Sequence, residues 1–137
     1  MSISPYLFYS GDCAEAFRFY QSVLGGELQV MTNADAPADV DQMPGAAPTQ
    51  VMHAALTLPD ALLMGSDDPT GDGGRKTGVA VVYTAPDEAS ARGIFDALSA
   101  GGEVQMAFET TFWSKGFGVF TDRFGVPWMI DTAGDVS

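Results

Sequence analysis

The stretch GGELQV at residues 25–30 recurs almost unchanged as GGEVQM at residues 101–106. Each copy follows a segment with helical spacing of apolar residues and begins a segment that reads as a β-strand. A glycine pair that ends a helix and leads into a strand, at the same point of both halves, indicates a duplicated module. Two copies that share a face are expected to enclose a cleft, and we expect the function of the protein to lie there.

Both halves predict the order strand, helix, strand, strand, strand. In the first half a helix is capped by Asp12, and the predicted strands are residues 4–10, 27–33, 50–58 and 61–66. In the second half a helix begins at Pro86, and the predicted strands are residues 77–83, 103–109, 116–122 and 127–132. Residues 34–49 predict a long loop. We therefore expect one domain over residues 1–137, with a first βαβββ module at 1–66, a polar linker at 67–76 and a second module at 77–137.

The composition excludes several classes of partner. The 137 residues include 6 basic and 18 acidic side chains, a net charge of −12 at pH 7, so no basic cluster can neutralise the phosphates of nucleic acid or an anionic membrane. The single cysteine, Cys13, cannot form an internal disulfide and fits a reducing compartment. Pro5 and Asp12 interrupt any apolar run that a signal peptide would need, and no stretch is long enough to span a bilayer. We expect a cytoplasmic protein.

Two segments carry a resemblance to a known family. The first is PYLF at residues 5–8 with GDCAEA at 11–16; the second is TFW at 111–113 with TDRFGVPWMI at 121–130. Together with the two-module order, they resemble the PhnB-like branch of the vicinal oxygen chelate superfamily, which includes glyoxalase I, bleomycin resistance proteins and extradiol dioxygenases. The resemblance covers nearly the whole chain. It implies an α+β fold in which eight strands form a curled sheet around a cleft, and pairing of two chains into a homodimer.

Metal enzymes of this superfamily hold their ligands, usually His or Glu, on the first and fourth strands of each module. By spacing, these positions fall near Pro5, near Met64, at Val79 and at Met129. Proline and valine offer no donor atom, and the methionine thioether suits Cu(I) rather than the ions that such chemistry uses. We therefore expect no metal and no other cofactor. Without the metal, the electrophile that polarises a substrate oxygen in those enzymes is missing.

Strand alternation predicts which side chains face the cleft and which pack against the helices. The expected cleft residues are His53, Ala55, Thr57, Met129 and Asp131, with Gln29 and Gln105 on the second strand of each module. The residues expected to pack against helices are Leu28, Met52, Ala54, Leu56, Leu58, Val104, Trp128 and Ile130.

Three groups of residues could carry chemistry or bind a ligand, and each has an alternative structural role. His53 is the only histidine and could act as a general base, or could be a hydrogen-bonded residue without a catalytic part. Asp131 could orient His53 or bind a substrate hydroxyl, or could be a solvated carboxylate at a strand end. Phe112 and Trp113 could stack on a flat ligand, or could fill the core or a dimer contact.

The sequence favours a metal-free protein that binds or sequesters a small molecule in an apolar cleft. Two alternatives stay open. One is an enzyme that uses His53 and Asp131 with an unidentified cofactor or metal, and the other is an assembly module without a ligand. The identity of the ligand does not follow from the residues.

Overall fold

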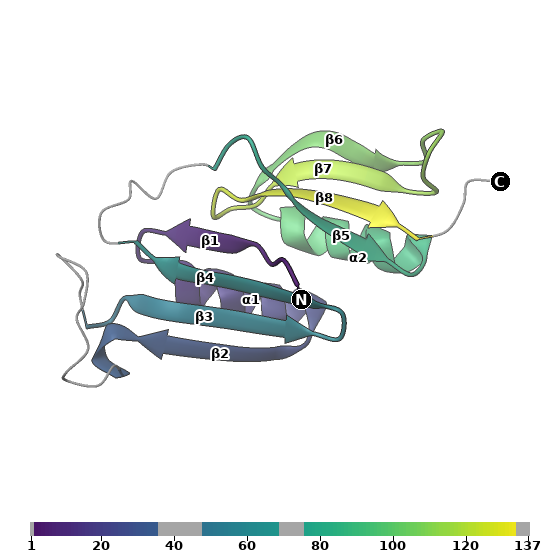
Figure 1. The fold of residues 1–137 in the computed structure, drawn as a ribbon. Coiled ribbons are helices and arrows are strands. Elements are labelled where there is room, and N and C mark those ends of the chain that lie inside the picture. Colours follow the sequence, from purple (N-terminus) through teal and green to yellow (C-terminus); the bar gives the residue numbers. More distant parts are fainter. Residues whose placement is uncertain (1, 36–47, 69–75, 134–137) are drawn as a thin grey trace. The chain divides into compact units, whose positions relative to one another are not determined.

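The computed structural model describes residues 2–35, 48–68 and 76–133, and the chain divides into two compact units at residues 1–74 and 75–137 (Figure 1). The first unit contains β1 (Tyr6–Tyr9), α1 (Cys13–Leu24), β2 (Glu27–Thr32), a 3-10 turn (Asn33–Asp35), β3 (Val51–Leu58) and β4 (Ala61–Asp67). The second contains β5 (Val81–Ala85), α2 (Glu88–Ser99), β6 (Glu103–Glu109), β7 (Phe117–Thr121) and β8 (Pro127–Thr132). Each unit is therefore a βαβββ module, and the predicted α+β class is confirmed.

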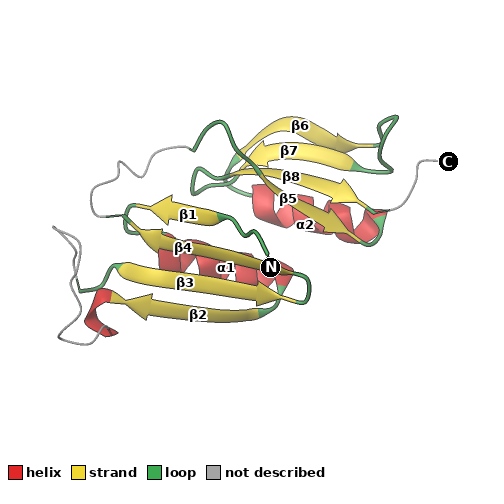
Figure 2. Cartoon of the chain, viewed as in Figure 1, coloured by secondary structure: helices red, strands yellow, loops and turns green. Residues whose placement is uncertain are grey.

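The eight strands form two sheets of four, in the orders β1-β4-β3-β2 and β5-β8-β7-β6. In each sheet the first strand pairs parallel with the fourth, and the remaining pairs are antiparallel. One helix lies against one face of each sheet (Figure 2). We call the other face of each sheet, which the helix of its own unit does not cover, its open face.

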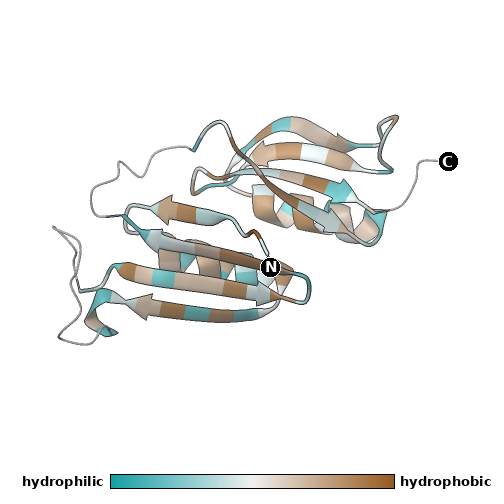
Figure 3. Ribbon diagram, in the orientation of Figure 1, coloured by the Kyte–Doolittle hydropathy of each residue, from teal (hydrophilic) through white to brown (hydrophobic). Residues whose placement is uncertain are grey.

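The core of each unit lies between its helix and its sheet. In the first unit the predicted stripe of α1 is buried at Cys13, Ala16, Phe17 and Tyr20, against buried residues of the strands such as Leu7 and Leu56. Because strand side chains alternate between the two faces, apolar and polar positions alternate along β2 in Figure 3. Ala54 and Leu56 are buried as predicted, and His53, Ala55 and Thr57 therefore point to the open face.

The start of α1 is stabilised by a carboxylate from a distant strand. Asp12 occupies the N-cap as predicted, but its side chain makes no capping hydrogen bond. Instead the backbone N–H groups of Gly11 and Cys13 donate to Oδ1 of Asp67, at 2.8 and 3.0 Å, and Val51 donates to Oδ2 at 2.8 Å. Asp67, which the sequence placed in the linker, thus belongs to β4 and joins the helix to two strands.

In the second unit a second aspartate organises the turn before β8. Asp122 Oδ1 accepts hydrogen bonds from the backbone of Phe124 and Val126, and Oδ2 accepts one from Nε1 of Trp128 at 2.9 Å. Trp128 is fully buried and stacks on Phe120 with a ring-centroid distance of 6.5 Å. The prediction that Trp128 belongs to the core is confirmed.

Two local predictions are wrong. The strand expected at 77–83 is β5 at Val81–Ala85, because its parallel pairing with β8 begins at Val81 and because Gly78 has a φ of +80°. Met52 is only partly buried, and its neighbour Val51 is buried instead, since the pairing of β3 with β2 shifts register at that end. Val104 pairs with the buried Phe120 and so lies on the helix side of its sheet as predicted, but at the edge strand it stays 48% exposed.

Two further predictions fall partly outside the described part of the chain, namely the loop at 34–49 and the linker at 67–76, because residues 36–47 and 69–75 are not described. Neither helix of the described ranges is long and apolar enough to cross a membrane.

Candidate functional site

Strand pairing brings a mixed set of side chains together on the open face of the first sheet. Tyr6 pairs with Met64, Met64 with Ala55, and Ala55 with Gln29, so these four form one row across the sheet. The neighbouring positions are occupied by the pairs Phe8 with Ser66 and His53 with Met31.

The hydroxyl of Tyr6 lies 3.2 Å from Nδ1 of His53, and their ring centroids are 5.8 Å apart. The ring of Phe8 lies 5.2 Å from that of Tyr6. Tyr6 is 38% exposed and Phe8 is 54% exposed, so both rings are accessible from this face. His53 was predicted from the sequence, whereas Tyr6 and Phe8 were not. Alternation within β1, where Leu7 and Tyr9 are buried, was the signal that could have found them.

The Tyr6 contact determines what His53 can offer to a ligand. If the Tyr6 hydroxyl donates to Nδ1, the imidazole carries its proton on Nε2 and presents an N–H donor. If Nδ1–H donates to Tyr6, Nε2 is an acceptor. Within the described residues no side chain hydrogen-bonds to Nε2, so this atom can donate or accept according to the tautomer.

The open face of the second sheet is more apolar. Val82, Met129, Val119 and Met106 pair in turn and form a row of apolar side chains across all four strands. The next row contains Thr84, Asp131, Phe117 and Glu109. Met129 and Asp131 therefore lie on the open face as predicted.

Phe112 and Trp113 lie on the loop between β6 and β7 and form an exposed aromatic group with Phe117. Ring centroids are 4.7 Å apart for Phe112 and Trp113, and 5.4 Å apart for Trp113 and Phe117, in both cases edge to face. Phe112 is 89% exposed and Trp113 is 50% exposed, so neither fills the core of its own unit.

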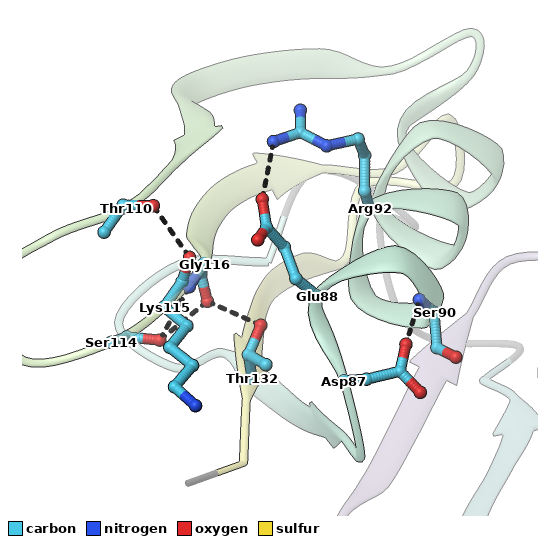
Figure 4. Close-up of polar contacts among 9 residues, drawn as sticks. All are labelled: Asp87, Glu88, Ser90, Arg92, Thr110, Ser114, Lys115, Gly116 and Thr132. Carbon is cyan, nitrogen blue, oxygen red and sulfur yellow. Dashed lines mark hydrogen bonds and ion pairs between the residues drawn. The ribbon is translucent and has the colours of Figure 1, made fainter. Parts of the chain in front are cut away.

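Internal hydrogen bonds hold this loop in place. Thr110 Oγ1 donates to the carbonyl of Lys115 at 2.9 Å, and Thr132 Oγ1 donates to the carbonyl of Gly116 at 3.1 Å (Figure 4). The backbone N–H of Ser114 donates to Thr111 Oγ1 at 3.1 Å. The aromatic side chains are therefore carried by an ordered turn.

Asp131 is held by residues of its own unit. Its Oδ1 accepts the hydroxyl of the buried Ser114 and also the backbone N–H of Thr132 at 2.8 Å. Ser114 was not predicted, because nothing in the local pattern distinguishes it from any other loop serine. The observed partner of His53 is Tyr6, and the idea that Asp131 orients His53 stays a prediction.

The two predicted glutamines differ in their surroundings. Gln29 is exposed in the row that contains Tyr6. Gln105 is exposed at a register shift of β6, where its Oε1 accepts from Thr121 Oγ1 at 3.4 Å. Neither lies in the hollow of about 360 Å³ that is lined by residues 2–5 and 58–62. The expectation that His53 and Trp113 face one cavity also stays a prediction.

The side-chain rows on the two open faces can be compared with the ligands that the metal enzymes of the family require. Spacing placed two ligand positions near Pro5 and at Val79, but pairing puts Tyr6 beside Met64 and Val82 beside Met129 on the open faces. Val79 is exposed and lies before β5. Neither pair provides the His and Glu ligands of the metal enzymes, and within the described residues no three His, Cys, Asp or Glu side chains cluster as a metal site. The donor set does not fit that metal.

Comparison with known proteins shows which family has this architecture. Residues 2–130 match the glyoxalase/bleomycin resistance protein/dioxygenase superfamily. The chain belongs to this superfamily. Protein YjdN of Escherichia coli strain K12 is 33% identical to it over 139 residues, with 96% of this chain and 95% of that protein covered. The resemblance found in the sequence is thereby confirmed.

Solved structures of superfamily members agree with the fold. Protein PA1353 from Pseudomonas aeruginosa is 39% identical, with a TM-score of 0.86, and the match covers 98% of this chain and 99% of that one. The PhnB protein from Bacillus cereus has a TM-score of 0.76 at 24% identity, with 97% of this chain and 100% of that one covered. The second likeness supports the PhnB-like resemblance at the level of the fold.

Proposed function

We propose that this superfamily member binds a small organic molecule on its open sheet faces and does so without the metal of its enzymatic relatives. The observation that carries the proposal is the contact between Tyr6 and His53, flanked by Phe8, on a face that its own helix leaves uncovered. Small-molecule sites commonly combine apolar and aromatic walls with a few polar groups that fix orientation.

The second open face supports the same function. Its apolar row, which runs from Val82 to Met106, is bordered by the aromatic group of Phe112, Trp113 and Phe117. Large exposed apolar side chains that cluster on one face indicate an interaction site. We include Met129 and Asp131 as ligand contacts, together with Gln29 and Gln105 at the edges. We further propose a reducing, cytoplasmic location, since the single cysteine, Cys13, is buried in α1.

One observation keeps the enzyme alternative open. A histidine whose Nδ1 is held by a tyrosine hydroxyl has a defined orientation, and its Nε2 could take a proton from a bound substrate. That reading needs a second group, and Asp131, which the sequence suggested could orient His53 or bind a substrate hydroxyl, accepts a hydrogen bond from Ser114.

Mass spectrometry of small molecules released from the purified protein tests the proposal. The protein is isolated under mild conditions, denatured and extracted, beside a Tyr6→Ala, Phe8→Ala double variant and a Val104→Ala control. Val104 is similarly exposed but lies away from the open faces. We expect one compound to leave the wild-type protein and the control and to be missing from the double variant. Equal recovery from all three folded proteins would contradict the site.

Elemental analysis tests the metal-free part of the proposal. Because Tyr6, Met64, Val82 and Met129 occupy the paired positions, we expect no stoichiometric Zn, Ni, Mn or Fe after mild purification. One such ion per chain would contradict this part and would favour the enzyme alternative.

A further inference from the structure

The two units carry very different charges. Residues 1–74 contain ten Asp and Glu against one basic residue, Arg18, whereas residues 75–137 contain eight against five. Most of the net charge of −12 therefore belongs to the first unit. Arg18 is on α1, which packs against the covered face of the first sheet. The described part of the open face of that sheet thus has no Lys or Arg side chain.

The absence of Lys and Arg from the described part of this face favours a cationic ligand over an anionic one. A phosphate, phosphonate or carboxylate is normally bound by Arg or Lys, and on this face it would meet the acidic field of the unit with His53 as the one basic side chain among the described residues. A cation would be attracted by the same field. Glu27 adds a carboxylate on the open face itself, because it pairs with Thr57, which in turn pairs with Leu62.

The aromatic residues of the face can bind a cation directly. The exposed rings of Tyr6 and Phe8, with centroids 5.2 Å apart and planes inclined by 44°, form two adjacent walls. The face of an aromatic ring attracts a cation that lies within about 6 Å of its centroid. With Nδ1–H donating to Tyr6, His53 Nε2 can also accept a hydrogen bond from an N–H or O–H group carried by the cation.

We infer that the open face of the first sheet, at Tyr6, Phe8 and His53, binds an organic ammonium ion. This inference rests on the proposed small-molecule function and specifies the class of ligand for that site.

Three small molecules of similar size but different charge test whether the site prefers a cation, a neutral molecule or an anion. Choline is the cation, 3,3-dimethylbutan-1-ol is its uncharged isostere, and propylphosphonate is an anion. Each is titrated into the full-length protein, and the amide and aromatic resonances are followed by NMR. We expect choline alone to shift resonances of β1 and β3, and we expect its affinity to fall as ionic strength screens the acidic unit.

The variants Phe8→Leu and Tyr6→Leu keep apolar bulk but remove the aromatic ring. Each should weaken choline binding about two- to five-fold, which corresponds to an exposed cation–π contact. Val104→Ala truncates an exposed side chain that lies away from the open faces and should leave the affinity unchanged, whereas Phe112→Leu tests the second unit as the alternative site. The dispersion of the NMR spectrum of each variant reports on its folding.

Two outcomes would overturn the inference and leave small-molecule binding intact. One is equal affinity for the uncharged isostere, and the other is tighter binding of propylphosphonate. Choline shifts that Phe112→Leu abolishes and Phe8→Leu preserves would overturn the assignment to the first sheet. A lack of binding by all three probes would overturn the ammonium class, whereas the released-molecule experiment decides the proposed function separately.

Discussion

The hydrogen bond between Tyr6 and His53 joins two strands that are not neighbours, because β4 lies between β1 and β3. The two side chains therefore reach across β4. This arrangement places the imidazole of His53 beside the ring of Tyr6, which in turn contacts the ring of Phe8. The contribution of His53 to ligand binding can be measured directly.

We expect His53→Ala to weaken binding of the released ligand by about 1–3 kcal/mol, the cost of leaving a polar partner unpaired. Isothermal titration calorimetry with the ligand identified by mass spectrometry is the measurement. Trp113→Ala should also weaken binding, through contact area lost on the second unit. Unchanged calorimetric binding in both folded variants would mean that the ligand lies on another surface.

Trp128 and Trp113 offer a matched pair for stability. Trp128 is buried, stacks on Phe120 and donates to Asp122, whereas Trp113 is half exposed on a loop. We expect Trp128→Ala to lower the free energy of unfolding by about 3–5 kcal/mol. Trp113→Ala should lower it by much less. Urea denaturation followed by circular dichroism measures both, and similar losses in the two variants would refute the assigned roles.

At the scale of the element, the two helices begin in different ways. The N-terminus of α1 donates to Asp67, a residue 54 positions from Cys13 along the chain. The N-terminus of α2 is capped locally, because the side chain of Asp87 accepts from the backbone of Ser90 at 2.8 Å (Figure 4). The first helix therefore needs its sheet to complete the cap, and the second carries its own cap.

The local cap of α2 predicts that the stability of the protein depends on pH through the titration of Asp87. The hydrogen bond from the Ser90 backbone lowers the pKa of Asp87 below its ordinary value of 3.8. A carboxylate with a lowered pKa in the folded state contributes stability above the unfolded value, and this stability is lost as the pH falls through the folded pKa. We expect Asp87→Ala to have a lower urea midpoint than the wild type at pH 7.

The difference between Asp87→Ala and the wild type should narrow as the pH is lowered below 3.8. Asp87→Asn keeps an acceptor oxygen but cannot titrate, so its midpoint should lack this part of the acid dependence. Urea midpoints for the three proteins between pH 2 and pH 7 provide the comparison. A constant difference between Asp87→Ala and the wild type over this range would contradict the assignment.

At the scale of the whole molecule, large apolar side chains remain exposed in each unit. They include Phe8 and Met31 on the first open face, Val82 and Met106 on the second, and Phe112 and Trp113 on the loop. Apolar surface of this kind commonly marks an interaction site, and the net charge of −12 helps to keep such a chain in solution.

We predict that the chain forms a homodimer, the commonest closed assembly. Light scattering at micromolar concentration should give about twice the chain mass of 14.4 kDa. Added salt should favour the dimer because it screens repulsion between the acidic chains. A mass near that of one chain, in both low and high salt, would contradict the prediction.

The sequence alone determined the features that depend on short-range geometry. The glycine pairs mark the ends of both helices, where Gly25, Gly26 and Gly101 adopt a positive φ. The apolar stripes, the limits of β6 and β8, and the burial of Trp128 follow from periodicity within a few residues. The superfamily could be recognised for the same reason, since its motifs are continuous stretches.

Only the tertiary structure decided which distant residues meet. Asp67 caps α1, Tyr6 binds His53, and Ser114 binds Asp131 because strand register sets these partners, and register is not visible in any one segment. The start of β5 was misplaced for the same reason, since its pairing with β8 defines it. The face of the sheet on which a side chain lies follows from alternation along its own strand. Its hydrogen-bond partner depends on how the strands pair, and that pairing is set by the free energy of the whole sheet.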